Sequence, residues 1–386
     1  MREVIPLSVP VLNGSEWKYV KECLDSGWIS SAGSFVGKFE AQVADYTGAK
    51  HAIAVVNGTA AIHLSLVLSG VKPGDCVLMP SLTFVATANA ISYTGAEPIF
   101  IDANLDDWQM DSGLLQQYLE EECQTKGEAT YRKKDGKRVA AIVPVHVQGN
   151  IGAIEKVIEL ADAYFIPVVE DSAEALGSFK KGKSAGRFGK LGCLSFNGNK
   201  IISTGGGGMI ITDDDELAKK AKHLSTTAKT DSLTYFHDEV GYNYRLVNVL
   251  AAIGVAQMER LEAYVVKKQF IGDYYRQHLN GIGDISFQEI HKEVSFNNWL
   301  FTISTSKQTD LLTYLNEKEV MCRPFWMPMH LLPMYQTLEF YGSNRNSEII
   351  HETSLAIPCS VDLTEQQLQR VVETIKAFFA TETRYS

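Results

Sequence analysis

The sequence has few cysteines, a deficit of basic residues and no long apolar stretch. Its six cysteines form no CxxC pair, which argues against a zinc site or a disulfide framework and indicates free thiols. Lysine and arginine number 36 against 46 aspartates and glutamates, a net charge of −10, so we expect no nucleic-acid partner. No stretch reaches about 18 uninterrupted apolar residues, so we expect no transmembrane helix and no membrane partner.

The two ends of the sequence add an expectation about location. Residues 1–6 lack the apolar core of a signal peptide, and the last residues carry no prenylation cysteine. Together with the free thiols, these ends predict a cytoplasmic protein. The 386 residues, 45% of them hydrophobic, are enough for two or three domains with a large core.

Short apolar runs alternate with helical patterns over the first two thirds of the sequence. The apolar runs lack polar alternation, which is typical of strands covered on both faces, so we predict a mostly parallel α/β sheet. Strands are expected at 51–56, 77–79, 98–102, 140–147, 165–170, 191–196 and 209–212, and helices at 59–69, 87–94, 112–122, 151–163 and 216–223.

The pattern changes near Gly241. Apolar residues recur with helical period over 246–268, and a further helical stretch reaches His278 before a glycine-containing turn. The last hundred residues predict strands at 300–304 and 320–325, a helix at 311–317 and a final helix from Thr364. We therefore expect a large domain at 1–270, with its extreme N-terminus packing on a smaller α+β domain at 271–386.

Two segments suggest nucleotide contacts that the surrounding sequence does not support. Residues 177–184 match the phosphate-loop pattern GxxxxGK[ST], but no strand directly precedes them and a glycine-rich segment follows, so we predict no ATP site. The glycine run 205–208 precedes a strand, which argues against a dinucleotide fingerprint. Residues 124–138 are polar and basic and predict an exposed loop, with nucleotide contact as the alternative.

A phosphate site is predicted where a strand ends and a helix begins, within residues 55–64. The free amides of Gly58, Thr59 and Ala60 at a helix N-terminus could bind phosphate, although a plain helix cap gives the same pattern.

Two further residues stand at predicted strand ends. Asp171 follows a buried strand and could pair with a protonated ring nitrogen, or only cap the next turn. Lys200 lies between an apolar strand and a glycine run, where a desolvated amine becomes nucleophilic; a solvated loop lysine is the alternative. A phosphate cup, a carboxylate for the ring nitrogen and a lysine for the Schiff base are what pyridoxal phosphate requires.

Over nearly its whole length, the sequence resembles the DegT/DnrJ/StrS family of sugar aminotransferases. The matching segments are 27–33 with 39–40, 57–61, 170–173, 195–196 with Lys200, and 241–245. The resemblance implies the type I aspartate-aminotransferase fold, a large α/β/α sandwich with a smaller C-terminal α+β domain. It implies pyridoxal 5'-phosphate as cofactor and no metal.

The resemblance also assigns roles to single residues. Lys200 and Asp171 become the catalytic pair. Gly58, Thr59, Ala60 and Ser195 contact the cofactor phosphate, Phe84 stacks on its ring unless it only packs in the core, and Asn243 reaches the phosphate from the neighbouring subunit of a homodimer. Glu174 stands where many relatives have Gln or His, so its cofactor contact is left open. Ser30 and His330 are candidate substrate contacts, with a structural role for His330 equally expected.

The implied reaction is amino transfer from an amino acid, glutamate by resemblance, to a nucleotide-linked keto-sugar. Within the family, residues 124–138 and 195–200 resemble enzymes that aminate C4 of UDP-2-acetamido-2,6-dideoxy-4-hexulose, en route to legionaminic-acid or bacillosamine-type sugars. A GDP- or dTDP-linked acceptor and amination at C3 are the alternatives. A silent sensor that binds cofactor and sugar is a further one.

Overall fold

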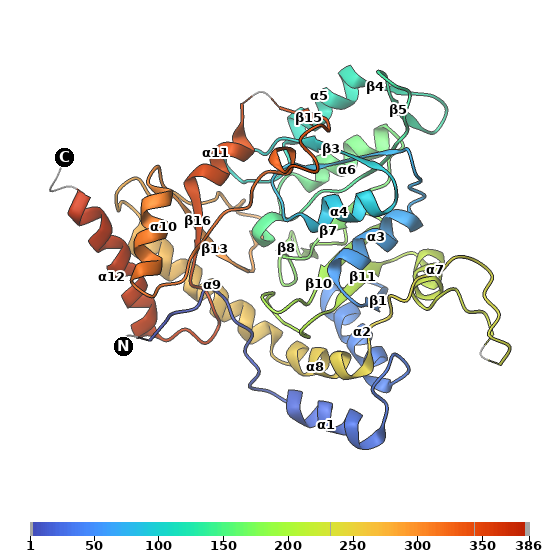
Figure 1. Ribbon diagram of the computed structural model, residues 1–386, viewed down its shortest axis with the longest axis horizontal. Helices are drawn as coiled ribbons and strands as arrows, with labels where there is room; N and C mark the ends of the chain where they lie inside the picture. Colours follow the sequence, from blue (N-terminus) through green and yellow to red (C-terminus); the bar gives the residue numbers. More distant parts are fainter. Residues whose placement is uncertain (1–2, 232, 343, 383–386) are drawn as a thin grey trace.

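The computed structural model describes residues 3–231, 233–342 and 344–382, and its centre is a mixed β-sheet (Figure 1). Parallel bridges between Ile142 and Val168 and between Val145 and Asp171 join its two four-stranded halves. In spatial order the strands are β1 (His51–Val55), β11 (Gly208–Thr212), β10 (Leu191–Ser195), β7 (Val169–Asp171), β6 (Val139–Ile142), β2 (Cys76–Pro80), β3 (Glu97–Ile101) and β15 (Phe340–Tyr341). Strand β11 runs in the direction opposite to the other strands of this sheet, because residues 196–207 connect it to β10 without a crossover helix.

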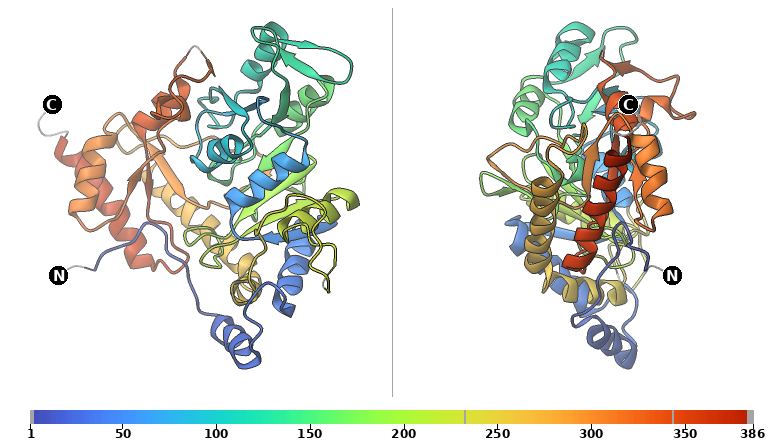
Figure 2. Two further views of the ribbon diagram at one scale, coloured as in Figure 1. Left: turned by 45° about the vertical axis from the view of Figure 1, so that its right-hand side comes forward. Right: turned by 90° about the vertical axis from the view of Figure 1, so that its left-hand side faces the viewer.

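Helices cover both faces of this sheet, and the expected α/β/α sandwich is confirmed (Figure 2). Side chains alternate between the faces, so Ile53 and Ile210 pack in one core and Ala54 and Ile211 in another. One face carries α3 (Gly58–Leu68), α4 (Ala86–Tyr93) and α7 (Asp215–Ser225). The other carries α2 (Ser34–Thr47), α5 (Ser112–Glu122), α6 (Ile154–Ala163) and α8 (Asn248–Met258), and α1 (Glu16–Ser26) lies against α8.

The C-terminal third forms a separate, smaller core around an antiparallel sheet. Its strands are β13 (Phe301–Ser304), β16 (Ser354–Ile357) and β14 (Arg323–Pro324), and its helices are α9 (Leu261–Leu279), α10 (Gln308–Glu317), α11 (Asn346–Thr353) and α12 (Glu365–Glu382). Ile5 is buried in this core and forms a bridge with Val320, as expected for the N-terminal segment. The division at residue 270 stays a prediction, because α9 crosses it with Leu261 in one core and Leu279 in the other.

Some elements differ from the expectation. The helical pattern of 246–268 is interrupted at Glu259 and Arg260, between α8 and α9, although both helices contribute to one core on either side of the break. The predicted strand 320–325 is reduced to β14. Short elements complete the fold: β4 (Cys123–Thr125), β5 (Thr130–Arg132), β8 (Phe179–Lys180), β9 (Lys183–Ser184), β12 (Val294–Ser295), and the 3₁₀ turns η1 (Val147–Gly149) and η2 (Met329–Leu331).

Two of the segments considered for nucleotide contact, 177–184 and 124–138, have structural roles. Residues 177–184 form the tight hairpin of β8 and β9, in which Lys181 and Gly182 have positive φ, so no helix follows to complete a phosphate loop. The expectation of an exposed loop at 124–138 is wrong for Arg132, which is 1% exposed and ion-paired on β5. Within the described ranges, no helix has both the length and the apolar character needed to span a bilayer.

Candidate active site

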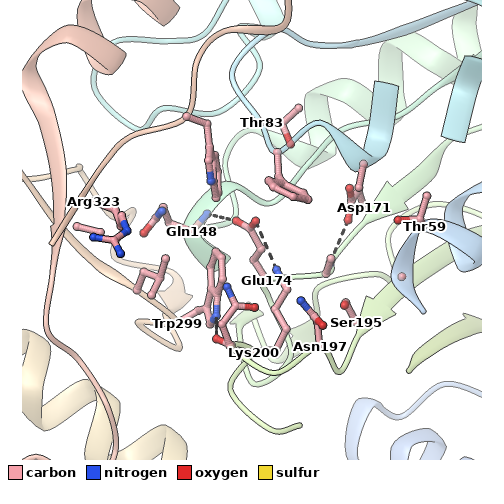
Figure 3. A pocket seen from close by; sticks show the side chains of 18 of the residues that line it. Thr59, Thr83, Gln148, Asp171, Glu174, Ser195, Asn197, Lys200, Trp299 and Arg323 are labelled. Atoms are coloured by element: carbon pink, nitrogen blue, oxygen red, sulfur yellow. Dashed lines mark hydrogen bonds and ion pairs between the residues drawn. The ribbon is translucent and has the colours of Figure 1, made fainter. Parts of the chain in front are cut away.

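A cavity of about 450 Å³ opens where the carboxyl ends of the central strands meet the C-terminal sheet (Figure 3). Ligands of parallel α/β sheets gather at this edge because strand ends and helix N-termini converge there. Its polar lining residues are Asn57, Thr59, Thr83, Gln148, Asp171, Glu174, Ser195, Asn197, Asn199, Lys200 and Arg323, and its aromatic ones are Phe84, Trp299, Phe325 and Trp326.

Lys200 presents a desolvated amine to this cavity. Its Nζ lies 3.9 Å from the centroid of the Trp299 ring and 3.7 Å from Glu174 Oε1, and its side chain is only 12% exposed. The Trp299 indole is fixed by a 2.6 Å hydrogen bond from Nε1 to the Asn199 carbonyl. Burial lowers the pKa of Lys200, which raises the fraction of neutral, nucleophilic amine. The solvated-lysine alternative therefore does not hold.

Asp171 ends β7 and presents a buried carboxyl group to the same cavity. Thr87 Oγ1 donates a 2.6 Å hydrogen bond to Oδ2, and the Ala173 N–H donates a 3.0 Å bond to Oδ1. Burial raises the pKa of Asp171 against these hydrogen bonds. Each carboxylate oxygen can accept more than one hydrogen bond, so the group can cap the turn and still receive a ring N–H.

Glu174 lies between Lys200 and η1 (Figure 3). Its Oε2 accepts a 2.8 Å hydrogen bond from the Gln148 N–H, while Oε1 faces Lys200. Burial raises the pKa of Glu174 to about 7. The contact that the sequence left open is thus, within this chain, a contact with the lysine, and this carboxyl group gains or loses its proton near neutral pH.

The opposite end of the cavity is formed by the start of α3 and the end of β10. Gly58 approaches Ser195 so closely that a Cβ on Gly58 would lie 2.8 Å from Ser195 Cβ, which explains the glycine. Asn57 Oδ1 caps α3 by accepting a 2.7 Å bond from the Ala60 N–H. Ala60 does not line the cavity and its amide is already used, so the free phosphate donors are the first amides of α3, with the Thr59 and Ser195 hydroxyls.

These groups fit pyridoxal phosphate. The desolvated amine of Lys200, the buried carboxyl of Asp171 and the helix terminus at Thr59 all line one cavity, which is the arrangement that the aldehyde, ring nitrogen and phosphate of this cofactor require. Phe84 also lines it with an exposed ring, available for stacking, and the core-packing alternative does not hold.

Besides Ala60, three candidates from the sequence lie outside the cavity. His330 is held by a 2.7 Å contact between its Nδ1 and Ser81 Oγ and by stacking on Phe340, which supports a structural role. The exposed Ser30 contributes its carbonyl to a 2.8 Å hydrogen bond with the Asn248 N–H. Asn243 is exposed and does not line the cavity of its own chain, so its contact across a subunit interface stays a prediction.

Sequence reasoning missed four residues that shape the site. Gln148, Trp299, Trp326 and Arg323 all line the cavity and come from segments assigned to strands or left without assignment. Their sequence context carries no motif. Only the Gln148–Gly149 pair, typical of a tight turn, hinted at an irregular backbone next to the site.

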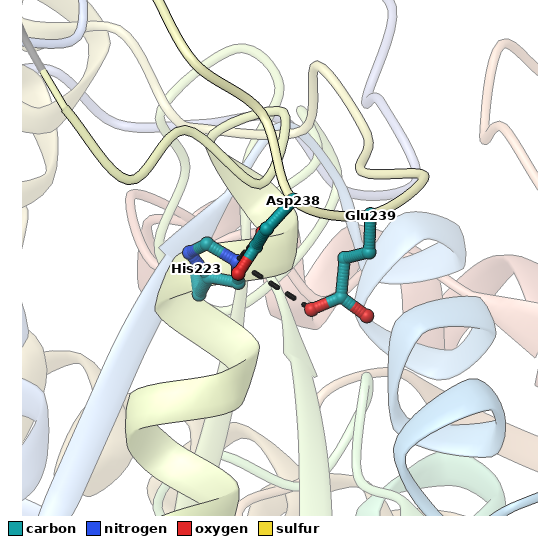
Figure 4. Close-up of side chains that lie close together, drawn as sticks. All are labelled: His223, Asp238 and Glu239. Atoms are coloured by element: carbon teal, nitrogen blue, oxygen red, sulfur yellow. Dashed lines mark hydrogen bonds and ion pairs between the residues drawn. The ribbon is translucent and has the colours of Figure 1, made fainter.

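A second polar cluster lies on the surface, away from this cavity (Figure 4). His223 Nε2 lies 2.7 Å from Asp238 Oδ1 and 3.5 Å from Glu239 Oε1. Lys220 also pairs with Glu239. Lys220 and His223 already occupy these carboxylates, so the cluster carries no argument for a bound metal ion.

The chain is similar in sequence and in fold to known aminotransferases, in agreement with the geometry of the cavity. Residues 10–376 match the model of the DegT/DnrJ/EryC1/StrS aminotransferase family. EpsN of Bacillus subtilis (strain 168), which its name assigns to the pyridoxal phosphate-dependent aminotransferases, is 38% identical over 99% of this chain and 97% of its own. The GDP-perosamine synthase of Escherichia coli O157:H7 is 37% identical over 97% of this chain and 99% of its own. The solved structure of the aminotransferase TlmJ from Streptoalloteichus hindustanus has a TM-score of 0.89 at 28% identity, covering 98% of this chain and 100% of that one.

Proposed function

Because the chain belongs to the DegT/DnrJ/EryC1/StrS aminotransferase family, a family of pyridoxal phosphate-dependent sugar aminotransferases, we propose a specific reaction for it. The enzyme transfers the amino group of L-glutamate to C4 of UDP-2-acetamido-2,6-dideoxy-4-hexulose. The observation that carries amino transfer is Lys200, a desolvated amine in a cavity that also holds Asp171 and Glu174.

The side chains divide the work of the reaction. Pyridoxal phosphate supplies an aldehyde and a ring that takes up carbanion charge. Lys200 Nζ would hold the aldehyde of the cofactor, and the Lys200 amine would move a proton to and from the α-carbon of the donor. Asp171 keeps the ring nitrogen protonated, and Thr87 fixes the orientation of that carboxylate. Trp299 covers one side of Lys200 and excludes water.

The nucleotide is the least constrained part of the proposal. Residues 195–200 support the UDP-sugar, but Arg132 in the basic segment 124–138 is buried in ion pairs and unavailable to a nucleotide. The similarity to a GDP-perosamine synthase favours a GDP-linked keto-sugar as the second candidate.

An amino-transfer assay with a panel of keto-sugars tests this function. UDP-, GDP- and dTDP-linked 4-keto-6-deoxy sugars and a 3-keto sugar are each incubated with the holoenzyme and ¹⁵N-labelled glutamate, and NMR locates the label. We expect ¹⁵N at C4 of the UDP-linked product. Faster transfer to the GDP-sugar selects the second candidate. If the cofactor is bound but glutamate transfers its amino group to none of the sugars, the result favours a silent sensor.

We also propose a homodimer in which Asn243 of one subunit reaches the cofactor phosphate of the other. Light scattering should report a dimer, and an active monomer would contradict the proposal. Complementation is a sharper test. A Lys200→Ala chain and an Asn243→Ala chain, mixed to form heterodimers, should recover one intact site per dimer. If the mixture is no more active than its components, Asn243 acts within its own chain or not at all.

A further inference from the structure

Among the described residues that line the cavity, Arg323 is the one that carries a guanidinium group. It belongs to β14, and its side chain is exposed at the end of the cavity away from Thr59 (Figure 3). Its hydrogen bond is a 2.9 Å donation from Nη1 to the Cys322 carbonyl, and within the described part of the chain no carboxylate lies at ion-pair distance. Most of its donors are therefore free to bind an anion.

Gln148 adds a second unused donor at this end. Its φ of 62° lies in the left-handed region that side chains other than Gly, Asn and Asp rarely adopt. The backbone N–H is held by Glu174 Oε2 at 2.8 Å, and Oε1 accepts a 3.1 Å bond from Thr302 Oγ1. Of the two polar atoms of the Gln148 side chain, Nε2 is the one with no hydrogen-bond partner among the described residues. The strained backbone thus holds an amide donor at the wall of the cavity.

We propose that Arg323 and Gln148 bind the α-carboxylate of the amino donor. This deepens the proposed function and rests on it. A guanidinium beside an amide N–H₂ provides parallel donors for a planar carboxylate, and one positive charge balances one negative charge. The other ionisable side chains of the lining are Lys200, which is taken up by the cofactor, and Asp171 and Glu174, which repel a carboxylate when ionised.

The position of Gln148 favours the α-carboxylate over the diphosphate of the sugar nucleotide. Its backbone N–H contacts Glu174, whose other oxygen lies 3.7 Å from Lys200 Nζ, so residue 148 is joined to the reacting amine through one side chain and lines the same cavity. An α-carboxylate is attached to the very carbon that loses nitrogen. A diphosphate is separated from C4 by the width of a sugar ring and falls further out. In the second half of the reaction, neutral sugar hydroxyls would face the same donors.

The donor half-reaction tests this assignment without a keto-sugar. Holoenzyme is mixed rapidly with L-glutamate, and loss of the aldehyde-form absorbance gives the half-saturating concentration. We expect Arg323→Gln to raise it roughly 10- to 100-fold, the effect of losing a charge-assisted hydrogen bond, and Arg323→Lys to raise it less. Gln148→Gly should raise it roughly tenfold while keeping the backbone, because glycine adopts positive φ freely. Arg345→Gln, on an exposed arginine paired with Glu348, is the matched control.

Two further measurements separate the possible outcomes. The half-saturating keto-sugar concentration for the amine form of the enzyme should change less than threefold in Arg323→Gln; a loss confined to this step assigns Arg323 to the diphosphate and overturns the inference. Calorimetric titration of the aldehyde form with 2-oxoglutarate reports carboxylate binding without turnover, because neither the keto acid nor this form of the enzyme carries a transferable amino group. Equal affinity in wild type and Arg323→Gln also overturns it. If wild type aminates no keto-sugar, the proposed function fails, yet this titration still decides the carboxylate site.

Discussion

Two regions of the molecule bury charged side chains and use them differently. Beside β5, the Arg132 guanidinium is surrounded by carboxylates: Nη2 lies 2.8 Å from Glu97, Nη1 lies 2.7 Å from Glu339, and Nε donates to Asp135 at 3.0 Å. The hydrogen bond from Arg132 lowers the pKa of Asp135 to about 2. In the cavity, by contrast, Lys200 faces its nearest carboxylate at 3.7 Å and a tryptophan ring.

The difference lies in how completely burial is compensated. The carboxylates around Arg132 keep the charges of that cluster fixed, so it holds β5 to its neighbours and performs no chemistry. Around Lys200, burial is incompletely compensated, so it lowers the pKa of the lysine and raises that of Glu174. Groups whose protons are loosely held are the ones that can move protons in a reaction. Four substitutions test this comparison.

The largest effect is expected from Lys200→Ala. The variant should lose amino transfer by at least roughly 10³-fold, since acid–base catalysis alone contributes about 10²–10⁴-fold and the covalent link is lost as well. The near-visible absorbance of the lysine-bound cofactor should disappear, while circular dichroism shows an intact fold. The exposed Lys183→Ala is the control. Turnover near the wild-type rate would rule out Lys200 as the reacting amine.

The second largest effect is expected from Asp171→Asn, because the asparagine amide cannot hold the ring nitrogen of the cofactor in its protonated form. We expect cofactor binding to persist and single-turnover rates to fall by about 10²-fold or more, measured by stopped-flow absorbance with glutamate. Asp135→Asn makes the same chemical change in the Arg132 cluster and should leave the rate unchanged. Equal rates in wild type and Asp171→Asn would contradict the role of Asp171.

Arg132→Met should affect stability rather than catalysis. Removing the buried cation leaves three carboxylates with only Lys134 and Lys137 as cationic partners, which costs up to about 3–5 kcal/mol of unfolding free energy in denaturant titrations. Arg345→Met, which breaks an exposed pair, should cost at most about 1 kcal/mol. The rate per folded Arg132→Met molecule should match wild type; a specific loss of rate would show that the two regions are coupled.

The smallest effect concerns pH and Glu174. Its pKa rises on folding from the ordinary 4.5 to about 7, so the native state favours the protonated carboxyl. The stability that this carboxyl group contributes is fully present at pH values below its pKa in the unfolded chain, and it is lost as the pH rises through about 7. The Tm of cofactor-free Glu174→Gln, relative to that of cofactor-free wild type, should therefore increase by a few degrees as the pH rises from about 5 to 8. A Tm difference that does not vary with pH would mean that Glu174 stays ionised in the folded protein.

The core and the main site residues were predictable because they follow local rules. The unbroken apolar runs indicated strands covered on both faces, and Asp171 and Lys200 stood beside predicted strand ends. The fate of Arg132 was not predictable. A basic segment is usually exposed, and only the tertiary contacts of Arg132 with Glu97 and Glu339 add two distant carboxylates to its neighbour Asp135.

The sequence by itself indicated the alternation of strands and helices over residues 51–223 and proposed Lys200 and Asp171 as site residues, because periodicity and chain neighbours specify them. Only the tertiary structure decided which distant residues meet these groups. Trp299, Arg323 and Gln148 come from three separate segments, and sheet packing brings them to one cavity with Lys200. Burial then sets the proton affinities at that cavity, since desolvation depends on everything packed around a group and not on its neighbours in the chain.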